Sequence, residues 1–175
     1  MKRWLRRGLV LVLLVALAGM LVPTSFTVPV RGADRRSYDQ RSYWYHPWGR
    51  SVTHKGVDIF ARAGTPVVSA DHGLVLFAGE NGRGGNVVLA LGPGWRLHYY
   101  AHLREIIAAP GDLLAPGEAV GTVGSTGNAA GKPAHLHYTI GTMLPRPWLA
   151  RSGPHGWRRM WYLDPTPLLN AACAP

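Results

Sequence analysis

Cysteine is nearly absent from this sequence, because Cys173 is the only one in 175 residues. A single thiol cannot close an internal disulfide. It also cannot build a four-cysteine zinc site or an iron–sulfur centre, since both need several thiolates. Any metal that this chain binds must therefore be held by histidine and carboxylate groups, and the sequence contains eight histidines.

Acidic residues are also scarce. Nine Asp and Glu stand against 19 Lys and Arg, which gives a formal net charge of +10. Four of the cations, Lys2, Arg3, Arg6 and Arg7, lie at the N-terminus, so the rest of the chain carries 15 basic against 9 acidic residues, or +6. Such a charge suits a polyanionic neighbour, and the candidates are nucleic acid, anionic lipid and an acidic cell wall.

Stretches suited to long helices are missing after the N-terminus. The chain contains 22 Gly and 14 Pro, which are too many helix breakers for a bundle or a coiled coil. The hydrophobic content of 47% nevertheless argues for a packed fold. After the first thirty residues about 145 remain, which is the size of one domain. The composition therefore predicts a single, turn-rich, mostly β domain.

Residues 1–30 are predicted to be a signal anchor or a signal peptide. Met1–Arg7 is strongly basic, and Gly8–Val30 then runs without a charge, long enough to cross a bilayer core of about 30 Å. Ala16–Ala18 offers a small-x-small cleavage site, but cutting there would leave a short apolar segment, which favours an uncleaved anchor. The positive-inside rule then places the domain outside, on the periplasmic side of the inner membrane. No nucleic-acid partner is expected there.

The remaining chain divides into three parts by composition. Residues 31–50 are basic and aromatic without a regular period and indicate a linker that passes into irregular structure. Residues 51–142 contain the short β-prone runs of the core. Residues 143–175 form an extension rich in Trp and Pro, and we expect Trp148, Trp157 and Trp161 to pack it across the core.

Short β-prone runs separated by glycine-containing turns predict the fold class. Two of the turns, Glu80–Gly85 and Gly92–Gly94, carry strong turn signals, and the stretch before Pro110 has room for one helical turn. Several short strands at this spacing indicate antiparallel sheets in a partly open barrel or sandwich. The seven runs are Gly56–Phe60, Thr65–Ala70, Gly73–Ala78, Asn86–Leu91, Arg96–Ala101, Ala119–Val123 and His135–Ile140.

The first histidine motif is H-x-x-x-D, formed by His54 and Asp58. On a helix these positions would be neighbours, but Val57 and Ile59 are β-branched and disfavour a helix. A straight strand would separate His54 and Asp58 by about 13 Å. Both side chains can reach one ion only if the backbone bends, and Gly56 supplies the freedom to bend.

The second motif is H-x-H, formed by His135 and His137. In a strand the two imidazoles project from one face with their backbones about 7 Å apart. A third candidate is His102, at the end of a run in which alternation predicts that His98, Tyr100 and His102 share a face. The other histidines, including His98, are interpreted as surface residues.

Together these motifs supply four imidazoles and one carboxylate, and zinc is the metal expected for such a set. A catalytic zinc takes three nitrogen or oxygen ligands from the protein and keeps one position for water. Two imidazoles are then left for general-base work and for stabilising an oxyanion. Spacing alone does not say which histidines bind the metal.

With these motifs in register, the chain resembles the lysostaphin-type (LytM-like) zinc metallopeptidases, which cut peptide bonds in peptidoglycan. The resemblance runs from Val52 to Thr142, through HKGVDIFARAGTPVVSADHGLV, GGNVVLAL, YYAHL, PGDLLAPGEAVGTVGSTGN and HLHYTI. It implies an antiparallel β fold with a narrow groove over one zinc ion. The implied zinc ligands are His54, Asp58 and His137, and the implied catalytic residues are His102 and His135.

The resemblance implies a zinc-dependent endopeptidase that hydrolyses cross-links or stem peptides of peptidoglycan. We expect the protein to be a monomer. The alternative is a non-catalytic envelope protein that activates other wall hydrolases, and such a protein should lack at least one of the five groups. All five are present. Two departures from the family pattern are the longer link AAGKPA before His135 and Thr139 at a position where Glu is frequent.

Overall fold

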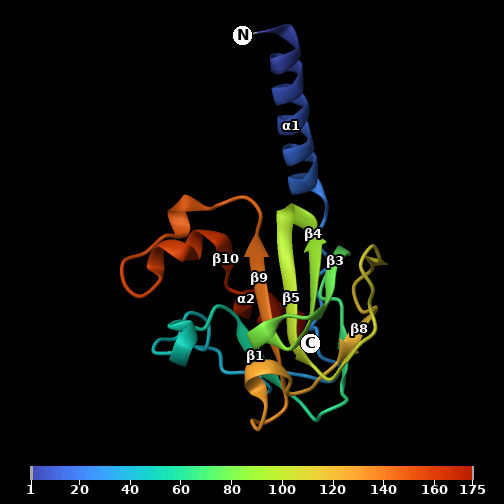
Figure 1. Cartoon of the computed structure of the whole chain (residues 1–175), viewed down its shortest axis with the longest axis vertical. Helices are drawn as coiled ribbons and strands as arrows, with labels where there is room; N and C mark the ends of the chain where they lie inside the picture. Colours follow the sequence, from blue (N-terminus) through green and yellow to red (C-terminus); the bar gives the residue numbers. More distant parts are fainter. Residues whose placement is uncertain (1, 175) are drawn as a thin grey trace.

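The computed structural model describes residues 2–174. Its first element, helix α1 (Arg3–Leu21), extends from one end of the β domain and projects away from it over most of its length (Figure 1). The helix has a mean hydropathy of 1.9 and contributes no residue to the protein interior, so it is long and apolar enough to cross a membrane. Such a helix fits the predicted signal or anchor.

The domain consists of two antiparallel sheets. In the larger sheet the strand order is β1-β9-β5-β4-β3-β7, and β10 also pairs with β9. Its strands are β1 (Val57–Phe60), β3 (Gly73–Glu80), β4 (Asn86–Gly92), β5 (Arg96–Leu103), β7 (Leu113–Leu114), β9 (His135–Thr142) and β10 (Tyr162–Leu163). The smaller sheet has the order β2-β8-β6, with β2 (Pro66–Val68), β6 (Glu105–Ile106) and β8 (Ala119–Thr122).

This architecture confirms the predicted mostly β fold with a partly open sheet arrangement, and the larger sheet does not close into a barrel. Each of the seven predicted runs overlaps one strand. Both predicted turns join neighbouring strands: Gly82–Gly84 forms the 3-10 turn η2 between β3 and β4, and Pro93–Trp95 forms η3 between β4 and β5. The remaining helical segments are η1 (Gly49–Ser51), η4 (Gly127–Ala129), η5 (Pro147–Leu149), η6 (Gly156–Trp161) and α2 (Thr166–Ala172).

One local prediction was wrong, because no helical turn precedes Pro110. The chain there forms β6, which pairs with β8, and the Ile107 amide donates to the Val120 carbonyl at 3.0 Å. A single isolated helical turn gains one hydrogen bond for several fixed residues. Pairing with β8 instead gives the backbone groups of this segment hydrogen-bond partners along the strand.

The core lies between the two sheets. On the larger sheet it contains Tyr100, Tyr138 and Ile59, and on the smaller sheet Val67 and Val120, all fully buried. The lead-in to the domain joins the same core, since Val30 forms a bridge with Val67 and Tyr38 is buried. Alternation along β9 places Leu136, Tyr138 and Ile140 in this core, which leaves the opposite face of β9 free to carry polar groups.

The C-terminal extension attaches through backbone pairing and through the leucines Leu163, Leu168 and Leu169, which pack on the core. Strand β10 pairs with β9, and Leu169 of α2 is fully buried. Trp148, Trp157 and Trp161 are 70%, 58% and 38% exposed, so the prediction that they pack the extension across the core was wrong. Backbone pairing of β10 with β9 holds the extension in place, so the tryptophan rings are not needed for its attachment.

His98 was predicted to lie at the surface and is instead buried in the core. Alternation places it on the inner face of β5 with Tyr100, and its Nδ1 shares a hydrogen bond of 2.7 Å with the Tyr138 hydroxyl. Burial lowers the pKa of His98 to about 4, and the nearby Arg96 charge acts in the same direction while Asp71 opposes it. The folded protein therefore holds this imidazole neutral.

The low pKa of His98 predicts acid sensitivity. In the unfolded chain the ring takes up a proton near its ordinary pKa of 6.5, whereas in the folded protein it does so near 4. Folding stability should therefore fall as the pH drops from 6.5 towards 4, by roughly 2–3 kcal/mol from this group. Urea unfolding between pH 7 and pH 4 should show a shallower decline for His98→Asn than for the natural chain, and parallel declines would contradict the assignment.

Candidate metal centre

The pairing of β1 with β9 builds the centre. Asp58 lies directly opposite His137, and Phe60 lies opposite His135. Opposed residues of an antiparallel pair project to the same face. The side chains of Asp58, His135 and His137 therefore share the outer face of the larger sheet, and all three line one groove. The prediction that both H-x-H imidazoles share a face is confirmed.

Gly56 brings His54 to the same place, but for a different reason from the predicted one. Its backbone does not adopt the left-handed conformation, so freedom to bend is not what the position requires. Instead, a Cβ at Gly56 would overlap the Tyr138 carbonyl oxygen and the Thr139 hydroxyl. Glycine is needed because the segment before β1 passes directly against β9, and this close approach delivers His54 to the centre.

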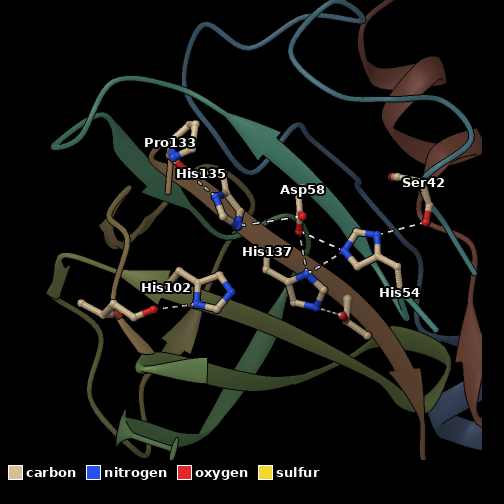
Figure 2. A network of polar contacts seen from close by, with 9 residues as sticks. Ser42, His54, Asp58, His102, Pro133, His135 and His137 are labelled. Atoms are coloured by element: carbon tan, nitrogen blue, oxygen red, sulfur yellow. Dashed lines mark hydrogen bonds and ion pairs between the residues drawn. The ribbon is translucent and has the colours of Figure 1, made fainter. Parts of the chain in front are cut away.

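The three predicted ligands converge. His54 Nε2 lies 3.0 Å from Asp58 Oδ1, and His137 Nδ1 lies 2.7 Å from the same oxygen. The two imidazole nitrogens are 3.1 Å apart. Figure 2 shows the rings of His54 and His137 next to each other and both directed at Asp58, with the rings of His135 and His102 beside this group. Two nitrogens and a carboxylate oxygen held this close form a donor set that fits a divalent cation such as zinc.

Backbone carbonyls orient three of the four rings. His54 Nδ1 donates to the Ser42 carbonyl at 3.0 Å, His102 Nδ1 to Thr126 at 2.9 Å and His135 Nδ1 to Pro133 at 2.8 Å. A carbonyl can only accept, so in each neutral ring the proton sits on Nδ1 and the lone pair on Nε2. The three Nε2 lone pairs are thus available for a metal or for a proton.

His102 reaches the groove through a backbone irregularity. Tyr99 and Ala101 line the groove, so regular alternation would turn His102 inward with His98 and Tyr100. His102 instead has a φ of 63° beside a bulge in the pairing of β4 and β5, and its ring lines the groove. The prediction that His98, Tyr100 and His102 share a face was therefore wrong. A non-glycine residue in this conformation is strained, and such strain concentrates at functional sites.

The pKa shifts suit Asp58 to metal binding and His102 to action as a base. Burial alone would raise the pKa of Asp58, but its contacts with His137 and His54 hold that pKa well below the usual range. The carboxylate is therefore charged, as a metal ligand must be. Burial, together with the nearby His137 and His135, lowers the pKa of His102 to about 4. His102 is therefore a neutral base at physiological pH.

Two supporting residues were missed in the sequence. The Thr139 hydroxyl lies 3.1 Å from His137 Nε2 and accepts its proton when Nδ1 faces the cluster. The Trp48 ring stacks on His54 with centroids 4.2 Å apart. The period of β9 could have placed Thr139 beside His137, because residues two apart share a face. The stacking of Trp48 on His54 follows no strand or helix period and leaves no comparable signal.

The groove over these residues has a volume of about 800 Å³, within the range of sites that hold small ligands. Its charged lining is mostly positive, with Lys55, Arg83 and Lys132. Among the described residues that line it, Asp58 is the only carboxylate. Burial lowers the pKa of Lys55, and the charges of Arg158 and Arg83 add to this effect. The excess of positive over negative side chains in its lining makes the groove complementary to an anion.

A His-Asp-His cluster beside two further histidines on an antiparallel sheet defines the class of metal-dependent hydrolases. Comparison with known families makes the class specific. Residues 52–145, more than half of the chain, match the model of peptidase family M23. The chain belongs to this family.

Relatives and solved structures agree with this assignment. The L-Ala–D-Glu endopeptidase of Bacillus subtilis (strain 168) is 33% identical over 165 residues, covering 84% of this chain and 43% of the relative. The catalytic domain of lysostaphin from Staphylococcus simulans superposes with a TM-score of 0.60 at 29% identity, covering 73% of this chain and 88% of that one. A zinc-containing peptidase from Vibrio cholerae gives 0.55 at 26% identity, covering 66% and 36%. The chain spans less than half the length of the curated relatives described here.

The contact between Thr139 and His137 predicts a measurable effect on metal affinity. Thr139→Val keeps the shape of the side chain but removes the oxygen that receives the His137 proton. Loss of such a supporting hydrogen bond typically weakens metal binding by about 10- to 100-fold. Competition with a chromogenic zinc chelator should show this loss for Thr139→Val but not for Thr139→Ser, which retains the hydroxyl. Equal affinities for the two variants would contradict the role.

Proposed function

We propose that this chain is a zinc-dependent endopeptidase that hydrolyses peptide bonds of peptidoglycan. The observation that carries the proposal is the convergence of His54, Asp58 and His137 beneath a groove that also holds His102 and His135. Membership of peptidase family M23 supports hydrolysis of a peptide bond. The names of its relatives, which include a peptidoglycan DD-endopeptidase of Vibrio cholerae, support the wall as the source of substrate.

In this proposal His54, Asp58 and His137 hold the zinc ion. Bound zinc supplies Lewis-acid polarisation of water and of the scissile carbonyl. His102 and His135 both present an Nε2 lone pair near the same point, with ring centroids 5.1 Å apart. Either ring can accept the proton of the attacking water, because its Nδ1 proton is held by a carbonyl. The imidazolium so formed can then donate to the oxyanion or to the leaving amine.

The substrate that fits the groove is a peptide with a free carboxylate. Lys55, Arg83 and Lys132 face the space above the metal centre, and the Asp58 carboxylate is already engaged by two imidazoles. Lys55 is fixed in place because its Nζ donates to the Ser51 and Thr53 carbonyls. Peptides of the wall that carry carboxylates are therefore preferred over neutral bridges of glycine.

We further propose that the enzyme is exported and stays at the outer face of the inner membrane through α1. The helix is uncharged from Gly8 to Leu21, and this stretch follows four cations within the first seven residues, which favours a cytoplasmic N-terminus. All five functional side chains come from one chain, so a monomer contains a complete site. A non-catalytic activator would not need this completeness, and zinc binding without hydrolysis would favour that alternative.

Two substitutions separate the proposed roles. His137→Ala should abolish both zinc binding and cleavage of defined muropeptides, because it removes a ligand. His102→Ala should leave zinc bound and lower turnover by roughly 10²- to 10⁴-fold, as expected for loss of a general base. Metal content and mass spectrometry of the digests, with and without chelator, measure both effects. His46→Ala, at an exposed position outside the groove, is the control. Full cleavage by His137→Ala would refute the ligand assignment.

The positive lining of the groove predicts that the enzyme distinguishes peptide substrates by their charge. A stem peptide with a free carboxylate should be cleaved with about tenfold higher kcat/KM than its carboxamide counterpart, because a hydrogen bond to a charged group contributes more than one to a neutral group. Lys55→Met should reduce this ratio, and added salt should reduce it too. Arg62→Gln, which removes an exposed cation outside the groove, should leave the ratio unchanged. A ratio of one in the natural chain contradicts the preference.

A further inference from the structure

The tip of the β4–β5 hairpin is fitted to helix α1. The Trp95 indole Nε1 donates to the Ala16 carbonyl at 2.8 Å, and a Cβ at Gly19 would overlap the Trp95 ring. Trp95 itself has a φ of 56°, and its carbonyl accepts from the Met143 amide at 2.9 Å. The ring thus lies in a notch that the small residue Gly19 leaves on the helix. Figure 1 shows the helix leaving the domain at this end of β4 and β5.

The position of the Trp95 contact along α1 determines how deep Trp95 lies in a membrane that the helix spans. The helix has 19 residues, so it is about 28 Å long, close to the roughly 30 Å of a bilayer core. Ala16 lies five residues before the last helical residue, Leu21, which is about 7 Å from the end of the helix. A ring that contacts Ala16 must therefore enter any membrane that the helix spans, about 7 Å below the end of the helix. Tryptophan is enriched at the nearby membrane–water interface.

Exposed apolar side chains surround the same end of the sheet. By strand pairing, the start of β3 and the strand β7 lie beside the end of β4, and they expose Leu74 and Leu113. Met143 and Leu144 follow the end of β9 and are also exposed. A cleft of about 540 Å³ between α1 and the domain is lined mostly by apolar residues. Exposed apolar clusters of this kind mark surfaces that contact a partner or a membrane.

We propose that this end of the domain rests on the outer leaflet of the membrane that α1 spans, with Trp95 inserted beside the helix and Leu74, Leu113, Met143 and Leu144 in contact with lipid. Lipid is the occupant because the apolar surface is continuous with the exposed surface of α1, and because the Trp95 contact lies at membrane depth. The metal centre then lies at a distance from the membrane, since His137 is five residues, or about 17 Å, along β9 from Thr142.

The test uses the full chain in vesicles of phosphatidylethanolamine and phosphatidylglycerol. In a Cys173→Ser background, Leu113→Cys is labelled with an environment-sensitive fluorophore, and Ala130→Cys, exposed on the loop near the catalytic groove, is the matched control. The label at position 113 should emit at shorter wavelength and lose emission to brominated lipid, whereas the label at position 130 should do neither. Solvent-like emission at position 113, or recovery of a chain cut after Ala18, would overturn the proposal.

A substitution within the helix tests the notch without altering the β domain. Gly19→Leu fills the notch that receives Trp95, so the label at position 113 should return towards solvent-like emission. Hydrolysis of a soluble peptide by the same variant should stay unchanged, because the substituted residue lies outside the domain. Unchanged quenching at position 113 in Gly19→Leu would show that Trp95 does not fix the domain on the membrane.

Discussion

The centre depends on the pairing of β1 with β9. This register sets Asp58 opposite His137, and the absence of a side chain at Gly56 allows the preceding segment to lie against the Tyr138 carbonyl. A shift of one residue would turn every side chain of β1 to the other face, which would bury Asp58 and expose Val57 and Ile59. The hydrophobic core and the donor set therefore specify the same register. Packing of Val57 and Ile59 in the core stabilises the position of the carboxylate outside it.

A second layer of polar groups fixes the tautomer of three of the histidines. Three of the rings are anchored by main-chain carbonyls of Ser42, Thr126 and Pro133, each on a segment outside the two central strands. Anchoring by carbonyls fixes which nitrogen carries the proton, so the rings present lone pairs before any ligand arrives. The irregular loops of this domain thus serve the site as much as the regular strands do.

The sequence allowed much of this structure to be predicted because its signals are local. Alternation in β9 placed His135 and His137 on one face, and turn residues marked the hairpins at Glu80–Gly85 and Gly92–Gly94. Predictions failed where a long-range contact or a backbone irregularity decides the outcome. The burial of His98, the reversal of His102 at a positive φ and the close approach at Gly56 all depend on neighbouring strands that no window of sequence reveals. Spacing also left the division between ligand and catalytic histidines open, and the resemblance to a family supplied it.

Strand β9 carries the centre near one end and meets the hairpin tip beside α1 at the other. With that tip on the bilayer, the length of β9 fixes the distance of the metal centre from the membrane. In the proposed arrangement a substrate must come within this distance of the membrane to be cleaved. Distance from the bilayer would then contribute to substrate selection.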